Sequence, residues 1–185
     1  MRRPRAPVGT VVSSMSTAVV STVDRAREIA ATVTDPEMPM LTLADLGVLR
    51  DVYDDGGTLV VTITPTYSGC PAMATMRDDL RRSLGASGFA DVDIHTVLEP
   101  AWSSDWISPE GRRKLAEHGI SPPTHGPARS GGPIAVTLTP PRRRLHCPQC
   151  GSPDTELTSE FGATSCKSLH RCLDCREPFD HVKEI

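Results

Sequence analysis

The stretch LGVLRDVYDDGGTLVVTITPTYSGCPA, residues 46–72, decides the fold of the first half of the chain. Two runs with β-branched residues flank the Asp/Gly cluster at 54–57, a pattern typical of a β-hairpin. Residues 71–84 then place apolar side chains on one face at helical spacing, with Pro71 suited to the first turn. The sequence therefore predicts strand, turn, strand and helix in that order, with Cys70 just before the helix.

The elements on either side of this stretch complete one domain. A helix is predicted from Thr17 to the step at 35–36, because a proline disfavours helical geometry in the residue before it. Residues 90–98 alternate apolar and polar and predict a third strand, and 108–118 predict a short helix. The predicted N-terminal caps of these helices are Ser21 or Thr22, and Ser108.

We expect an α+β fold, with a small mixed sheet, helices on one face, and a small C-terminal β module. The predicted division is a disordered tail at 1–16, an α+β domain at 17–120, a Pro/Gly/Arg-rich linker at 121–144 and a zinc ribbon at 145–185, held on a flexible tether. Three strands make a thin sheet, so a homodimer, or a further strand from the linker, is an additional expectation.

Composition excludes several classes of protein. The 185 residues carry a net charge of −3, which gives no electrostatic case for nucleic acid binding. No window approaches the roughly 20 apolar residues of a membrane span, and no secretory signal is evident, so we expect a cytoplasmic protein. The 17 prolines and 14 glycines indicate much loop and a modest core.

Two C-x2-C pairs predict a metal site in the last forty or so residues. Cys147 and Cys150 form the first pair, and Cys172 and Cys175 form the second, at the spacing of a zinc ribbon. In so small a module, metal binding would supply folding free energy on the order of 10 kcal/mol. Iron is the rival ion, since four thiolates also suit a rubredoxin-like or Fe–S site. Cys166 is either an alternate ligand or a small buried side chain.

Cys70 is the lone cysteine of the first domain. A thiol just before a helix lies where the helix dipole and free backbone N–H groups favour the thiolate, so it is a candidate nucleophile or metal ligand. The alternative is a buried structural cysteine. Asp35 and Glu37 flank a proline and, taken alone, indicate a turn with solvated carboxylates.

Several segments together resemble known proteins. The segments DPEMP at 35–39, DLGVLRDV at 45–52 and TPTYSGCPA at 64–72 resemble the signatures of the small domain shared by iron–sulfur assembly proteins, including SufT-like and cytosolic MIP-type factors. Further segments resemble the PaaD (also called PaaJ) family of accessory proteins encoded with phenylacetyl-CoA epoxidase. These are WSSDWIS at 102–108, GISPP at 119–123, FG at 161–162, CK at 166–167, RC at 171–172 and EPFD at 177–180.

The resemblance implies an accessory protein and not an enzyme. The epoxidase is a bacterial oxygenase with a di-iron hydroxylase and a reductase that carries flavin and a plant-type Fe–S cluster. The family is expected to help assemble or insert a metal centre, with the reductase cluster as the first choice. Cys70 would be the motif cysteine that touches iron or a cluster transiently, with Asp35, Glu37 and Thr66 around it. The partner would be the reductase or another epoxidase subunit.

Two other functions compete with this one. In a pure adaptor, both modules would only bind partners, and the zinc ribbon would scaffold the complex. A thiol oxidoreductase would use Cys70 or Cys166, but it needs a resolving thiol, and Cys70 has no neighbouring cysteine in the sequence.

Overall fold

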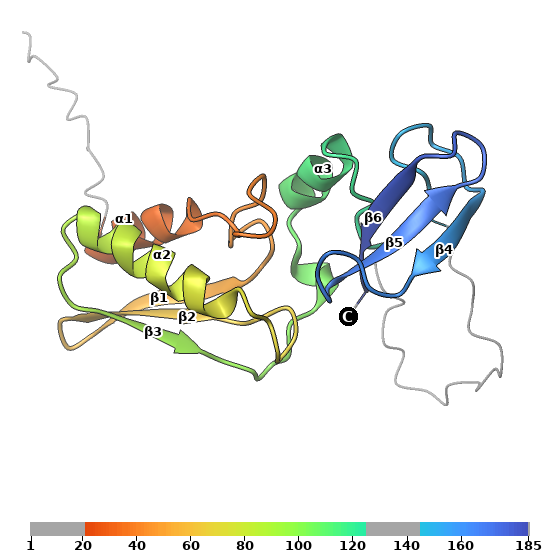
Figure 1. Cartoon of the computed structure of the whole chain (residues 1–185). Coiled ribbons are helices and arrows are strands. Elements are labelled where there is room, and N and C mark those ends of the chain that lie inside the picture. Colours follow the sequence, from red (N-terminus) through yellow and green to blue (C-terminus); the bar gives the residue numbers. More distant parts are fainter. Residues whose placement is uncertain (1–20, 125–144, 185) are drawn as a thin grey trace, which may run out of the picture.

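A computed structural model of the chain describes residues 21–124 and 145–184. We call these the first module and the C-terminal module; Figure 1 shows one three-stranded sheet in each. The predicted tail and nearly all of the predicted linker, with its extra strand, lie outside the described residues. The elements are α1 (Thr22–Ala31), β1 (Leu49–Asp55), β2 (Thr58–Ile63), α2 (Met73–Ala86), β3 (Val92–Thr96), η1 (Ser104–Trp106), α3 (Pro109–Glu117), β4 (Thr155–Ser159), β5 (Lys167–Cys172) and β6 (Pro178–Val182).

The sheet of the first module is mixed. β1 is antiparallel to β2, and β2 is parallel to β3. Val52, Val61 and Ile94 are register partners across the three strands and are buried. Figure 1 shows α1 and α2 together over one face of this sheet. Burying an aliphatic side chain of this size stabilises the fold by about 1.5–3 kcal/mol. The expected α+β arrangement, with helices on one face of a mixed sheet, is confirmed.

The helix boundaries differ in detail from the predicted ones. Ser21 caps α1 by accepting a hydrogen bond from the N–H of Asp24 (3.0 Å). α1 ends at Ala31, before the step at 35–36, and Thr34 instead forms a β-bridge with Thr42. The β-branched residues Thr32, Val33 and Thr34 prefer extended backbone, which explains the earlier end. α2 likewise begins two residues after the predicted first-turn proline.

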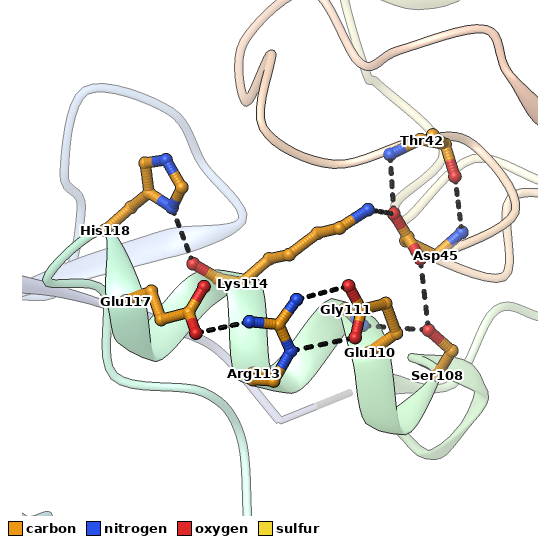
Figure 2. Close-up of polar contacts among 9 residues, drawn as sticks. All are labelled: Thr42, Asp45, Ser108, Glu110, Gly111, Arg113, Lys114, Glu117 and His118. Atoms are coloured by element: carbon orange, nitrogen blue, oxygen red, sulfur yellow. Dashed lines mark hydrogen bonds and ion pairs between the residues drawn. The ribbon is translucent and has the colours of Figure 1, made fainter.

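The Asp45 side chain joins α3 to the turn that precedes β1 through hydrogen bonds (Figure 2). Its carboxylate accepts hydrogen bonds from the N–H of Thr42 (3.0 Å), the hydroxyl of Ser108 (3.3 Å) and the ammonium of Lys114 (2.7 Å). The hydroxyl of Thr42 in turn accepts from the N–H of Asp45 (3.0 Å), the reciprocal arrangement of a capping box. Although burial opposes ionisation, the bonds from Lys114 and Thr42 outweigh it and hold the pKa of Asp45 below its ordinary value. Gly111 permits the close approach, because a Cβ there would lie 2.8 Å from the Asp45 carbonyl oxygen.

The C-terminal module docks on the first module through its last strand. Ser121 forms a parallel β-bridge with His181, and the N–H of Ser121 donates to the carbonyl of Asp180 (2.8 Å). The N–H of Val182 donates to the carbonyl of Ser121 (3.1 Å), and the Val182 side chain is buried in the core of the first module. The expectation of a module on a flexible tether is therefore wrong, because backbone bonds and apolar burial join β6 to the first module. No helix in the described ranges is long and apolar enough to cross a membrane.

Candidate metal centre and the cluster around Cys70

Two turns bring four sulfur atoms together in the C-terminal module. Cys147 and Cys150 lie before β4, Cys172 ends β5 and Cys175 follows it. The four Sγ atoms all lie within 4.8 Å of one another. The Sγ atoms of Cys147 and Cys175 are 3.7 Å apart, and those of Cys150 and Cys172 are 3.5 Å apart. Gly151, at φ 76°, closes the first turn by donating its N–H to the carbonyl of Cys147 (2.8 Å).

The electrostatics of this group favour a cation. Backbone N–H groups of Cys175 and Asp174 lower the pKa of Cys172 to about 7. The N–H of Glu177 favours the thiolate at Cys175 as well, but desolvation and the neighbouring thiols outweigh it and raise the pKa of Cys175 to about 12. Four adjacent sulfurs cannot all carry negative charge unless a positive ion offsets their repulsion.

The donor set therefore fits a tetrahedral metal ion. Four cysteines from two C-x2-C pairs are the usual ligands of structural zinc, and four thiolates also suit iron. The apolar cluster beside the sulfurs consists of Cys147, Cys172 and Phe179, which is too small to hold the module together alone.

Cys166 is not a member of this four-sulfur group. Its side chain is 6% exposed, and its Sγ lies 3.0 Å from the hydroxyl oxygen of Thr164. The carbonyl of Cys166 accepts a hydrogen bond from the N–H of Lys183 (2.9 Å), which anchors it beside β6. The four predicted ligands lie together, and Cys166 lies apart from them with a buried side chain.

Cys70 lies in the turn between β2 and α2 and is half-buried. Its N–H donates to the carbonyl of Tyr67 (3.2 Å). Burial raises the pKa of the Cys70 thiol; the N–H of Ala72 opposes this, while the carboxylates of Glu37 and Asp35 add to it. The expectation that the helix start favours the thiolate is therefore wrong, since desolvation and two acidic neighbours outweigh one backbone donor. Thr66 is half-buried in the same turn.

The two predicted carboxylates, Asp35 and Glu37, act electrostatically on Cys70. Asp35 is 4% exposed, and its Oδ1 accepts from the N–H groups of Glu37 and Met38, each at 2.8 Å. Asp35 is thus a buried turn residue and not a solvated one. Burial raises the pKa of both carboxyl groups, while the charge of Lys167 lowers them.

Lys167 is a buried charged residue that the sequence analysis did not single out as part of the site. Its side chain is 8% exposed, and its Nζ forms an ion pair with Oδ2 of Asp180 at 2.9 Å. Lys167 also acts electrostatically on Asp35, Glu37 and Cys166, so its positive charge faces the acidic side of the first module. No local signal in the sequence indicated this burial, since Lys167 begins β5 and its partner Asp180 lies in β6.

Two family models match different parts of this chain. Residues 24–95 match a family model described as an iron–sulfur cluster assembly protein, and residues 132–183 match the PaaD zinc beta ribbon domain. A protein of Escherichia coli (strain K12), named as a subunit of a "Putative 1,2-phenylacetyl-CoA epoxidase", is 44% identical over 153 residues, which is 83% of this chain and 87% of that protein.

Two shorter relatives carry a different name. An "Fe-S protein maturation auxiliary factor" of Porphyromonas gingivalis is 37% identical over 87 residues, covering 45% of this chain and 81% of that protein. The "Fe-S protein maturation auxiliary factor YitW" of Bacillus subtilis is 32% identical over 78 residues, covering 41% of this chain and 76% of that protein. These two maturation factors therefore match less than half of this chain.

Proposed function

This chain belongs to the PaaD family, which includes the phenylacetyl-CoA epoxidase component of Escherichia coli, and on that premise we propose that it is an accessory factor that matures the epoxidase without catalysing epoxidation. Its task is to assist assembly or insertion of an Fe–S cluster, and the reductase component is its client. Iron or a cluster is then a cargo that Cys70 holds transiently. The chain works in the cytoplasm, where such a client would be assembled.

One combination of features carries the proposal. The part of the chain that matches an iron–sulfur cluster assembly protein contains Cys70, Asp35 and Glu37. These side chains interact electrostatically, and a thiol with carboxylates is a donor set that suits iron. The relatives with shorter chains are named as Fe–S maturation factors, which points in the same direction.

The C-terminal module has a structural role in this proposal. Zinc bound by Cys147, Cys150, Cys172 and Cys175 would order β4–β6 and so hold the docked strand β6 in place. Zinc has no redox chemistry of its own, so the cargo chemistry belongs to the Cys70 side.

Cys70→Ser tests the proposal in cells that make the epoxidase components. The measurement is the iron and acid-labile sulfide content of the purified reductase, with its visible spectrum. We expect Cys70→Ser to lower cluster content to the level found without this chain, and Ser68→Ala, an exposed change in the same turn, to leave it unchanged. Full cluster content with Cys70→Ser would refute the proposed role.

The same cells distinguish the adaptor alternative. An adaptor would tolerate Cys70→Ser and would lose binding to the epoxidase subunits when Cys172→Ser disrupts the metal centre. Co-purification of the tagged chain with the other subunits measures that binding.

A further inference from the structure

We propose that the C-terminal module binds an extended segment of a partner protein in which aliphatic and basic side chains alternate. The binding site is a groove on the second sheet, which we call the β4 groove; Leu145, Glu156, Leu157, Glu160 and His170 are among the residues that line it. The described residues that line this groove include none of the six cysteines. The proposal therefore goes beyond the proposed function and does not depend on iron or a cluster as cargo.

The β4 groove runs over one face of the second sheet. Leu157 of β4 is the register partner of His170 in β5, and Ser168 of β5 is the register partner of His181 in β6. Residues that are paired across strands, or two apart along one strand, point to the same face, so these four side chains share a face. All four line the groove, whose volume is about 790 Å³. That volume lies within the range of protein ligand sites, roughly 300–1,000 Å³.

The polar groups of this sheet face already have partners within the protein. Oγ of Ser168 lies 3.0 Å from Nε2 of His170, and Nδ1 of His181 lies 3.1 Å from the carbonyl oxygen of Ser121. Leu157, in contrast, is 49% exposed. Covering it with an aliphatic side chain removes apolar surface from water, which is favourable. The face therefore suits aliphatic side chains and needs no polar ligand.

The charges around the β4 groove are all negative. Asp154, Glu156 and Glu160 line it, whereas no lysine or arginine among the described residues does. Within residues 21–124 and 145–184, none of these three carboxylates forms an ion pair. A groove with one sign of charge attracts a ligand of the opposite sign and repels the phosphates of nucleic acids and anionic lipids. The occupant is therefore a protein segment that carries lysine or arginine.

The strand β4 offers backbone partners to an extended segment. Among the described residues it pairs with β5 alone, and Figure 1 shows it at the edge of the second sheet that lies away from the first module. A free strand edge presents N–H and C=O groups to an added strand. Side chains of an added strand would lie beside Glu156 and Leu157 in turn, because successive residues alternate between the two faces. This alternation explains why the proposed segment has aliphatic and basic residues at alternate positions.

A second copy of this chain fits the same edge poorly. Pairing two β4 strands would bring two sets of the carboxylates of Asp154, Glu156 and Glu160 to one interface. Like charges brought together at an interface oppose association. The charge of the groove therefore favours a different, basic partner.

Fluorescence anisotropy of a labelled peptide tests the proposal on the full-length, zinc-loaded chain. The probe is a short synthetic peptide that alternates valine and arginine, and a peptide that alternates valine and glutamate should bind at least about tenfold more weakly. We expect Leu157→Ser to weaken binding of the probe about tenfold, because it removes the aliphatic contact. Glu156→Lys should weaken it by a similar factor and reduce its salt dependence.

The matched control variants are Leu98→Ser and Glu28→Lys. Leu98 is 54% exposed, close to the 49% of Leu157, and Glu28 is exposed on α1. Both controls lie in the first module and should bind the probe as the wild type does. Since all four substituted positions are exposed, the variants should fold, and thermal unfolding checks that they do.

Four results would overturn the proposal. Two come from the binding assay: no binding of the valine–arginine probe to the wild type, or equal binding by Leu157→Ser and Leu98→Ser. A wild-type dimer that Leu157→Ser converts to monomers in sedimentation would assign the groove to a second copy. Hydrogen-exchange protection of residues 125–144 that Leu157→Ser removes would assign it to the chain itself. None of these measurements involves iron or an epoxidase component, so the proposed function and this proposal can fail independently.

Discussion

Lys167→Met removes a buried positive charge from the C-terminal module and keeps most of the aliphatic stem. Lys167 is 8% exposed at its side chain, and its partner Asp180 is 25% exposed, with 2.9 Å between Nζ and Oδ2. Its charge also stabilises the ionised forms of Asp35 and Glu37. The variant therefore leaves the Asp180 carboxylate without its ion-pair partner and removes a charge that favours ionised Asp35 and Glu37.

The expected loss of stability follows from this geometry. Removing one partner of a buried ion pair costs about 3–5 kcal/mol, and the partial exposure of Asp180 places the effect at the lower end, about 3 kcal/mol. In a chain of this size, 1 kcal/mol moves the thermal midpoint by about 2–4 °C, so the midpoint should fall by about 6–12 °C.

The stability loss in Lys167→Met should depend on pH. A carboxyl whose pKa is raised on folding holds a proton that the unfolded chain releases, so its contribution to stability is present at low pH and is lost as the pH rises through the folded value. Asp35 and Glu37 are such groups, and loss of Lys167 raises their pKa further. The deficit of Lys167→Met should therefore be larger near pH 7 than near about pH 4.

The assay is thermal unfolding of the zinc-loaded protein, followed by circular dichroism at several pH values. Arg82→Met is the control, because its pair with Asp79 on α2 lies at the surface and should contribute about 0.5 kcal/mol or less. Asp180→Asn in the Lys167→Met background should recover part of the loss, since it removes the unpaired charge. A decrease in the free energy of unfolding of less than about 1 kcal/mol would refute the reasoning, because breaking a buried ion pair costs more than that.

Three further predictions concern the framework. Gly111→Ala should destabilise the protein by more than about 1 kcal/mol, the cost of overpacking, since the new Cβ would lie 2.8 Å from the Asp45 carbonyl oxygen. Gly85→Ala should instead stabilise it by about 0.5–1 kcal/mol, because Gly85 lies in α2 and a Cβ there would meet nothing within 4 Å. Urea unfolding measures both changes. Asp45→Ala should lower the free energy of unfolding by about 2–3 kcal/mol, because the hydrogen bonds to Lys114 and to the turn are lost. The pKa of Asp45 is lowered on folding, so the difference in stability between wild type and variant should vanish as the pH falls through that pKa. Zinc chelation should unfold β4–β6 while leaving the β1–β3 sheet largely protected in hydrogen exchange; equal protection of β4–β6 with and without chelator would contradict a metal-dependent module.

The successful sequence predictions rested on patterns among residues close together in the chain. The hairpin around residues 54–57 depends on turn chemistry within a few residues, and β1 and β2 form there. Ser108 caps α3 by accepting from the N–H of Gly111 (2.9 Å), again a contact between near neighbours. The two C-x2-C pairs predicted a four-sulfur group, because each pair needs only its own tight turn to point both thiols at one place.

Predictions about single thiols fared worse, because their environment is assembled from distant segments. Cys70 does precede a helix, as expected, but Asp35 and Glu37 come from the loop after α1, and they help burial to raise its pKa. Cys166 is close to the four predicted ligands in sequence, yet its sulfur is outside their group, and burial raises the pKa of its thiol with help from Asp35 and Glu37. Neither environment follows from spacing along the chain.

The sequence by itself determined the order of helices and strands in the first module, the four cysteines that group together and the family resemblance, since each of these depends on residues near one another in the chain. The tertiary structure decided what lies beside Cys70. The backbone bridge between Ser121 and His181 docks the C-terminal module, and that docking brings Cys166 and Lys167 to Asp35 and Glu37. The physical reason is that electrostatics and burial depend on distance in space, and two modules far apart along the chain leave that distance open until their surfaces pack.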